Sequence, residues 1–310
     1  MTVPPTLVTP PRVGCVYRPQ FAPERIATVA AAADVAGLDE LWLWEDCFLA
    51  GGISAAAIAL SNSSSLTVGV GVLPAPMRNV ALTAMEIATL CRAFPGRVRI
   101  GVGHGVQDWM AQIGEKVDSP MTLLREHLTC LTAVLGGEAV TFHGRYVHLD
   151  GVQLDWPPHP GTEILTGAMS PKTLRLSGEL AAGTVITGGT TPDALRSAVA
   201  NIRAGLALRS EPQPHSIVTY ILCTTGADAR QDLLKEIKHW GFDAENDVGV
   251  HGTAEEIAAA ARRWIDAGAD TIVLQPSAEA PIEEFVRFIG AEVCPRMRAS
   301  LHRSGTQPVV

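Results

Sequence analysis

Residues 23–44 read PERIATVAAAADVAGLDELWLW, and this stretch decides the fold. Apolar residues such as Ile26, Val29 and Ala33 recur at helical spacing over residues 23–36, which predicts a helix with one buried face. Gly37 follows where a helix end favours a left-handed residue. Residues 41–44 are then continuously apolar, as expected for a strand that is covered on both faces. The stretch therefore predicts one helix–turn–strand unit of a parallel α/β fold.

The same order of helix, glycine turn and short apolar run returns along the chain. Eight runs predict strands, at residues 12–17, 41–44, 66–73, 98–102, 163–166, 184–187, 217–223 and 271–274. Residues 139–142 and 146–149, joined by a His-Gly-Arg turn, predict a small antiparallel hairpin. We therefore predict a single (β/α)8 TIM barrel domain over residues 1–310, with an insertion around residues 105–161. An open doubly wound sheet is the alternative, but no GxGxxG motif opens the first helix.

Composition excludes several classes of function. The 24 Lys and Arg face 32 Asp and Glu, a net charge of -8, which argues against a nucleic-acid partner. No run of about 18 apolar residues is present, so no membrane span is expected. Prolines interrupt the start, MTVPPTLVTPPRVG, and the six cysteines are scattered singly, so we expect a cytoplasmic protein with reduced thiols. No HxH, HxxxH or HExxH spacing indicates a metal site.

The most informative motif is an internal duplication, ILTGAMSP at residues 164–171 and VITGGTTP at residues 185–192. Each copy predicts a strand, a glycine turn, a Ser or Thr N-cap, and Pro in the first helical turn. Two helix N-termini on adjacent strands would aim their free N–H groups at one point, which suits a phosphate. The candidate residues are Gly167, Ala168, Met169, Ser170, Thr187, Gly188, Gly189 and Thr190. The alternative is that these residues merely form tight loops between strand and helix.

Two carboxylates, Glu45 and Asp46, directly follow the predicted strand at residues 41–44. Catalytic groups of parallel barrels lie at this end of the strands. Alternation sends Trp44 and Asp46 to one side and Glu45 to the other. Asp46 is therefore a candidate for proton transfer, whereas Glu45 is expected to cap a helix or to pair with an arginine.

Glycines interrupt two further predicted strands. Gly69 and Gly71 lie within one strand, which indicates that something needs close access to the backbone there. Residues 101–105 read GVGHG and end the next strand, where His104 could face a ligand. A lone histidine serves structure as often as catalysis, so both interpretations of His104 stay open.

From residue 13 to about residue 289 the chain resembles the bacterial luciferase-like monooxygenase family, and within it the coenzyme F420-dependent branch. The resemblance is carried, in this order, by GLDELW at residues 37–42, GVGV at 69–72 with Arg78 following, GVGHG at 101–105, TGAMSPK at 166–172 and GTAEE at 252–256.

This resemblance implies a barrel whose mouth holds a deazaflavin or flavin ring. Gly71, Val72 and Leu73 would back the ring, with a non-proline cis peptide between Gly71 and Val72. Gly103, His104 and Gly105 would lie beside it, and the duplicated turns would hold the ribityl-phosphate part. Asp46 falls where that branch often has the histidine of an Asp-His pair, and Glu45 where it has the aspartate.

Two positions depart from the sugar-phosphate dehydrogenase of that branch. Thr190 stands where that enzyme has a lysine in its phosphate loop, so the resemblance does not carry over that contact with the phosphate tail. Val106 stands where it has a catalytic glutamate, which argues against sugar-phosphate oxidation by the same acid.

The sequence thus predicts an oxidoreductase that transfers a hydride between coenzyme F420 and a small, partly hydrophobic organic substrate. Asp46 and His104 are the catalytic candidates, and a homodimer is expected because barrels of this family commonly pair. The alternatives are an FMN-dependent luciferase-like monooxygenase and a catalytically silent flavin-binding barrel. An aldolase or isomerase ranks last, because no strand-end lysine suits Schiff-base chemistry.

Overall fold

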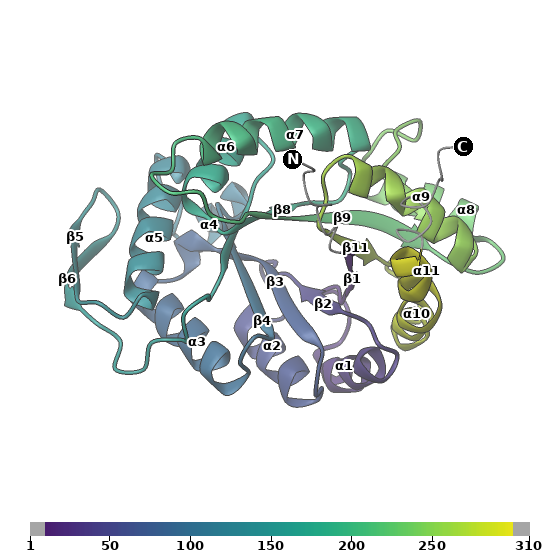
Figure 1. Ribbon diagram of the computed structural model, residues 1–310, viewed down its shortest axis with the longest axis horizontal. Coiled ribbons are helices and arrows are strands. Elements are labelled where there is room, and N and C mark those ends of the chain that lie inside the picture. The colour runs from purple at the N-terminus through teal and green to yellow at the C-terminus, as the bar shows by residue number, and fades with distance from the viewer. Residues whose placement is uncertain (1–9, 300–310) are drawn as a thin grey trace, which may run out of the picture.

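A closed parallel barrel forms the body of the computed structural model, which describes residues 10–299 (Figure 1). Residues 1–9, with most of the proline-rich start, and residues 300–310 lie outside the described residues. In barrel order the strands are β1 (Arg12–Val16), β2 (Glu40–Leu43), β3 (Thr67–Pro74), β4 (Val98–Gly103), β7 (Ile164–Gly167), β8 (Gly183–Ile186), β9 (Ser216–Thr224) and β11 (Thr271–Gln275). β1 pairs with both β2 and β11, and β8 pairs with β9, so the ring closes. The predicted (β/α)8 barrel is confirmed, and all eight predicted strands form it.

Helices connect the strands and cover the outside of the barrel (Figure 1). They are η1 (Pro23–Arg25), α1 (Ile26–Val35), α2 (Gly52–Ser61), η2 (Ala75–Met77), α3 (Val80–Ala93), α4 (Gln107–Gln112), α5 (Pro120–Leu135), α6 (Pro171–Leu180), α7 (Pro192–Leu206), α8 (Ala229–His239), α9 (Ala254–Asp266), α10 (Ile282–Phe288), η3 (Ile289–Val293) and α11 (Cys294–Ala299). Between α8 and α9, the short strand β10 (Gly249–His251) pairs with the C-terminal end of β9. Within residues 10–299 no helix is both long and apolar enough to cross a membrane.

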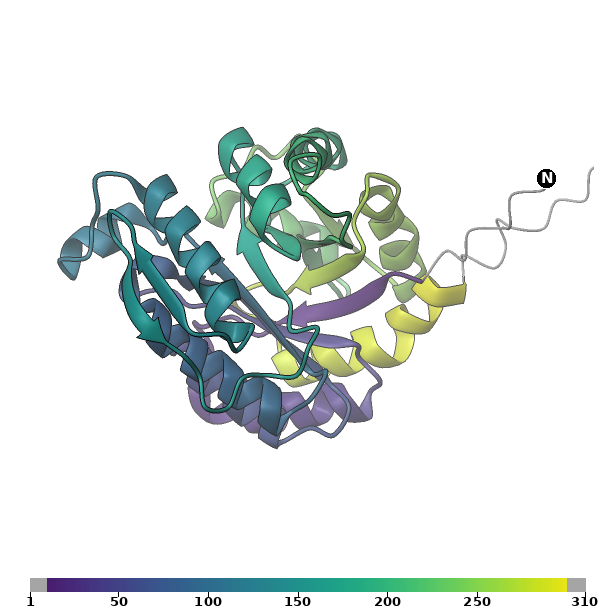
Figure 2. The ribbon, with the colours of Figure 1, turned by 60° about the vertical axis from the view of Figure 1, so that its left-hand side comes forward.

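The predicted hairpin is confirmed as β5 (Val140–His143) and β6 (His148–Val152), which pair antiparallel. It lies outside the ring of helices, beside α5 (Figures 1 and 2). Glu126 of α5 holds it there, because this carboxylate accepts the backbone N–H groups of Arg145, Tyr146 and Val147 at 2.8, 2.8 and 3.0 Å. Burial disfavours the charged form of Glu126, but these three bonds outweigh it and lower its pKa.

Two separate layers of side chains fill the barrel interior. A central apolar cluster joins Trp42, Leu165 and Val218 from three strands with further valines. At the N-terminal end a buried ion pair replaces the apolar residues: Arg99 Nη1 lies 3.0 Å from Glu40 Oε1, and Glu40 is fully buried. The indole Nε1 of Trp42 also donates to Glu40, at 2.6 Å. These layers close the barrel from the N-terminal side.

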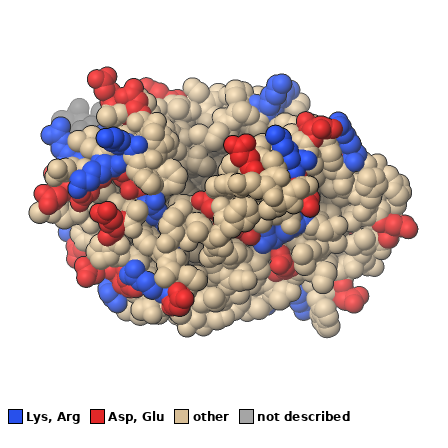
Figure 3. Space-filling view, turned by 180° about the vertical axis from the view of Figure 1, so that it is seen from behind, with Lys and Arg blue, Asp and Glu red and all other residues tan. Residues whose placement is uncertain are grey.

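Charged side chains of both signs are mixed on the face of the molecule opposite to the view of Figure 1. Figure 3 shows Lys and Arg interspersed with Asp and Glu on the face that it presents. That face therefore has no continuous positively charged surface that could bind a polyanion.

Candidate active site

The predicted site residues gather at one end of the barrel, because parallel strands bring their C-terminal ends to the same edge. Asp46 follows β2, and His104 follows β4. The two duplicated turns follow the neighbouring strands β7 and β8. This mouth is the candidate active site.

Val72 forms the floor of the mouth. The peptide bond between Gly71 and Val72 is cis, as the resemblance implied, and the register of β3 against β4 shifts between Val70 and Leu73. A Cβ placed on Gly101, Gly103 or Gly167 would lie within 2.7, 2.6 and 3.1 Å of the Val72 side chain. The three glycines therefore make room for Val72, which stays partly exposed. Packing against Val72 accounts for Gly103 and Gly167 without a ligand.

Packing below the floor accounts for the two glycines within β3. A Cβ on Gly69 would lie 2.4 Å from the Trp42 ring, and one on Gly71 would lie 2.5 Å from the Tyr220 hydroxyl. That hydroxyl is buried and has no hydrogen-bond partner within residues 10–299. Burial raises the pKa of Tyr220, so the phenol is neutral under the floor. The side chains that come close to the backbone of Gly69 and Gly71 are therefore Trp42 and Tyr220 of the same chain.

The duplicated turns have the predicted local structure. Ser170 accepts the N–H of Thr173 at 3.4 Å, and Thr191 accepts the N–H of Ala194 at 3.1 Å. α6 and α7 each start with proline, as the duplicated motif predicts. Both helices thus point capped N-termini at the mouth.

The two turns also converge. The hydroxyl of Thr187 donates to the sulfur of Met169 at 3.2 Å, so one turn touches the other. Within residues 10–299, the N–H groups of Met169, Gly188 and Gly189 donate to no backbone carbonyl. A Cβ on Gly188 would meet only Gln275 Oε1, at 3.4 Å, so space lies over this glycine. Free amides beside open space fit a bound phosphate.

Thr190 and Ala168, two further predicted contact residues, make hydrogen bonds within the protein. The hydroxyl of Thr190 donates to Thr187 O at 3.0 Å, and its carbonyl accepts Trp264 Nε1 at 2.8 Å. The N–H of Ala168 donates to Val185 O at 3.2 Å. The hydroxyl and carbonyl of Thr190 and the N–H of Ala168 therefore hold the turns in place.

The two carboxylates that follow β2, Glu45 and Asp46, have different hydrogen-bond partners. Glu45 receives two hydrogen bonds from Arg78, at 2.7 and 2.9 Å, which confirms the predicted arginine pairing. Asp46 receives the indole N–H of Trp44 at 2.7 Å. Burial raises the pKa of Asp46, while the bonds from Trp44 and Gln20 act in the opposite direction. Asp46 therefore holds a proton to a higher pH than an exposed aspartate does.

His104 is bonded through both ring nitrogens. Nδ1 lies 3.2 Å from Pro120 O, and Nε2 lies 3.1 Å from Thr173 Oγ1. Burial lowers the pKa of His104, so the ring is neutral, with Nδ1 donating and Nε2 accepting. The imidazole thus ties the end of β4 to the first turns of α5 and α6, which is the structural interpretation of this residue.

A group of residues that the sequence did not reveal lies beside the mouth, after β1 and around the end of α8. Arg18, which follows β1, is buried and donates to Glu236 of α8 at 2.6 Å. Trp240 and Phe242 follow α8 and stack on each other. The position of Arg18 just after a strand is a usable signal. Nothing local in the sequence shows that α8 meets the end of β1.

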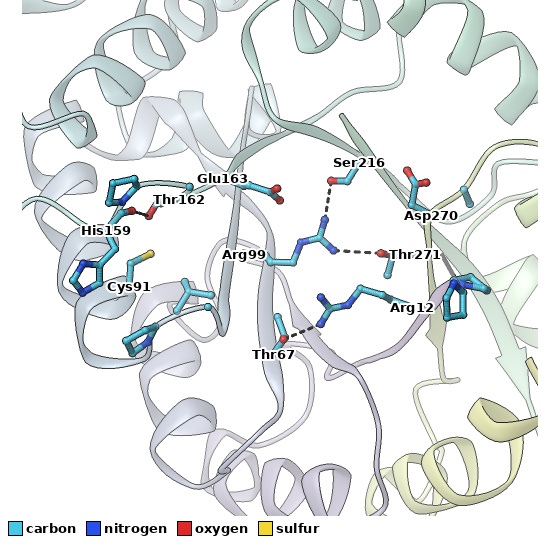
Figure 4. Close-up of a pocket in the computed structure, with 18 of the residues that line it drawn as sticks. Arg12, Thr67, Cys91, Arg99, His159, Thr162, Glu163, Ser216, Asp270 and Thr271 are labelled. Atoms are coloured by element: carbon cyan, nitrogen blue, oxygen red, sulfur yellow. Dashed lines mark hydrogen bonds between the residues drawn. The ribbon is translucent and has the colours of Figure 1, made fainter. Parts of the chain in front are cut away.

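A cavity of about 710 Å³ lies at the opposite, N-terminal end of the barrel (Figure 4). Arg99 donates there to Ser216 at 2.8 Å and to Thr271 at 3.3 Å, and Arg12 donates to Thr67. These arginines are already paired within the protein, and this end of a barrel serves stability. The cavity is therefore not the candidate site. Among residues 10–299, no group of three His, Cys, Asp or Glu side chains could hold a metal ion.

Known proteins resemble this chain over most of its length. The family model of luciferase-like monooxygenases matches residues 5–270. The 5,10-methylenetetrahydromethanopterin reductase of Methanolobus tindarius is 28% identical over 206 residues, which cover 66% of this chain and 63% of that protein.

Two solved structures share the fold. An F420-dependent secondary alcohol dehydrogenase, in complex with an F420-acetone adduct, has a TM-score of 0.83 at 19% identity, over 94% of this chain and 100% of that one. The oxygenating constituent of 3,6-diketocamphane monooxygenase of Pseudomonas putida, in complex with FMN, has a TM-score of 0.74 at 16% identity, over 93% and 99%. Since its model matches most of the chain, this protein belongs to the luciferase-like monooxygenase family.

Proposed function

We propose that this chain is an oxidoreductase that transfers a hydride between coenzyme F420 and a small, partly hydrophobic organic substrate. One observation carries the proposal: two turns with free amides converge beside the Val72 floor, where a phosphate and a flat ring can both be held. The names of related proteins favour F420 over FMN.

The residues present fit this cofactor. The amides of Met169, Gly188 and Gly189 would take its phosphate, next to the N-terminus of α6. The partly exposed Val72 would support the ring from below. Lys172, an exposed residue in the first turn of α6, would add a positive charge at this helix N-terminus.

In the reaction, the bound cofactor would supply or accept the hydride. Asp46 would exchange a proton with the substrate, because its raised pKa keeps the carboxyl group able both to hold and to release one. Trp44 orients that carboxyl through its indole N–H. His104 would keep the phosphate turn in place through Thr173.

The residues around the mouth favour a substrate without strong charge. Phe48 and Leu49 follow β2 and are 64% and 49% exposed, and Val106 follows β4 and is 48% exposed. Arg18 and Arg78, two arginines near the mouth, are both paired with glutamates. An apolar rim of this kind suits a partly hydrophobic molecule.

Binding titrations with F420 and FMN in parallel test the cofactor. We expect saturable binding of F420, followed by its fluorescence, and much weaker binding of FMN. Tight binding of FMN without binding of F420 would show instead a flavin monooxygenase. Binding of F420 without turnover of any donor or acceptor would favour a silent carrier.

A Gly188→Val variant shows whether the ligand sits at the duplicated turns. The added Cβ meets nothing closer than 3.4 Å, so the variant should fold, while its methyl groups enter the space over Gly188. We expect at least about a tenfold loss of affinity, the equivalent of one lost charge-assisted hydrogen bond. Unchanged affinity would place the ligand elsewhere.

We further propose that the protein is a cytoplasmic homodimer. Exposed apolar side chains lie on α2 and α3, including Ile58, Leu82 and Met85. Replacing Leu82 and Met85 by Glu should convert a dimer to a monomer in sedimentation experiments, because charges at the centre of an interface are costly. A wild-type protein that sediments as a monomer would contradict the proposal.

A further inference from the structure

The ring of Phe242 packs against the second duplicated turn, at residues 187–190. A Cβ on Gly189 would lie 2.5 Å from the Cε1 and Cζ atoms of the Phe242 ring. Gly189 also has a φ of 87°, a left-handed conformation that favours glycine. The backbone of Gly189 therefore rests directly on the outer edge of this ring.

Phe242 is itself held by its neighbours. Its ring stacks on that of Trp240, with centroids 6.5 Å apart and planes 14° apart. Its N–H donates to Ile237 O at 3.0 Å, which ties it to the end of α8. Trp240 in turn donates its indole N–H to Glu236 at 2.8 Å. The ring thus has a fixed place relative to α8.

A buried ion pair fixes α8 to the barrel. Arg18 and Glu236 are 1% and 5% exposed, and Arg18 Nη1 lies 2.6 Å from Glu236 Oε1. The guanidinium also lies over the Trp240 ring, at 5.4 Å from its centroid. Glu236 Oε2 accepts the N–H of Ala278 at 3.3 Å, after β11. The ends of β1 and β11 therefore determine where Phe242 lies.

The turn is held on its other side as well. Trp264 of α9 donates to Thr190 O at 2.8 Å, and both residues are buried. The segment from Thr187 to Thr190 is thus held between α9 and Phe242. Its free amides, those of Gly188 and Gly189, have little freedom to turn away from the mouth.

We propose that Phe242 is a positioning residue for the phosphate of the cofactor. Its ring, placed by Trp240 and the Arg18–Glu236 pair, holds Gly189 so that the amides of this turn point at the phosphate. The inference rests on the proposed function, because it takes the turn as the phosphate site. Preorganised donors bind more tightly because they lose less conformational entropy on binding.

The test compares two ligands that differ in the phosphate. Wild type and Phe242→Ala are titrated with F420 and with its phosphate-free deazaflavin–ribitol fragment. We expect Phe242→Ala to bind F420 about tenfold more weakly and the fragment within about twofold of wild type, since only the phosphate contacts are disturbed. Leu234→Ala, an exposed residue of α8, is the matched control and should bind both ligands as wild type does.

Further variants keep the test decisive. Phe242→Leu retains part of the contact and should restore part of the F420 affinity, and it replaces Phe242→Ala if that variant does not fold. Equal loss for both ligands, or no loss for either, would overturn the positioning role. If wild type binds no F420, the proposed function fails, and the same comparison with FMN and riboflavin decides the role of Phe242.

Discussion

An Asp46→Asn variant is expected to lose about 100-fold or more in kcat on any substrate that the wild type turns over, while its affinity for the cofactor changes far less. Removal of a positioned proton donor or acceptor has an effect of this size. The asparagine can still accept the indole N–H of Trp44, so the geometry around position 46 should be kept. Steady-state kinetics and a binding titration measure the two effects separately.

The pH profile gives a control for Asp46. Because burial raises the pKa of Asp46, the acidic limb of kcat/KM should lie above the ordinary aspartate value of 3.8 and should vanish in Asp46→Asn. In Trp44→Phe the carboxylate loses a hydrogen bond that lowers its pKa, so the limb should move to still higher pH. An Asp46→Asn variant with the activity of wild type would exclude the proton-transfer role.

An Arg99→Met variant should lose about 3–5 kcal/mol of unfolding free energy, because it leaves the carboxylate of Glu40 buried with fewer partners. Arg99 is 8% exposed and donates to both oxygens of Glu40, at 3.0 and 3.2 Å. It also donates to Ser216 and Thr271, so one guanidinium joins three other strands at the N-terminal end. Urea unfolding of the two proteins measures the difference.

Two variants check the cause of that loss. Arg12→Met removes the other cation near Glu40, but the Arg12 side chain is 48% exposed, so the loss should be only about 1 kcal/mol. The double variant Glu40→Met, Arg99→Met removes both buried charges and should regain much of the stability. If the double variant were less stable than Arg99→Met, the loss of partners by the buried Glu40 carboxylate would not be the reason.

Much of this fold could be predicted from local sequence patterns. Short β-branched runs and glycine turns predicted all eight barrel strands, and residues 139–149 predicted the inserted hairpin. The duplicated Thr-Gly motifs predicted two capped helices side by side, because neighbouring strands carry their turns to the same edge. The arginine partner of Glu45 was also expected, although the sequence could not say which arginine it would be.

Other features depend on contacts that local sequence does not show. Local sequence does not show that the glycines at positions 101, 103 and 167 accommodate Val72 from another strand, and the predicted cofactor contacts of Gly103 and Gly167 stay predictions. His104 could not be resolved from its motif, because its partners Pro120 and Thr173 come from later helices. Phe242 reaches Gly189 from more than 50 residues away. In each case a long-range packing partner decides the role.

The filled interior of the barrel has a consequence for how ligands come and go. Among the described residues, the paired Arg99 and Glu40 and the indole of Trp42 fill the barrel axis, so a ligand on Val72 would be reached from the C-terminal end of the strands. A ligand in contact with Val72 would have to bind before a second ligand that covers it, and would dissociate after that second ligand. If the proposed cofactor ring lies on Val72, binding would be ordered, with the ring binding first and leaving last.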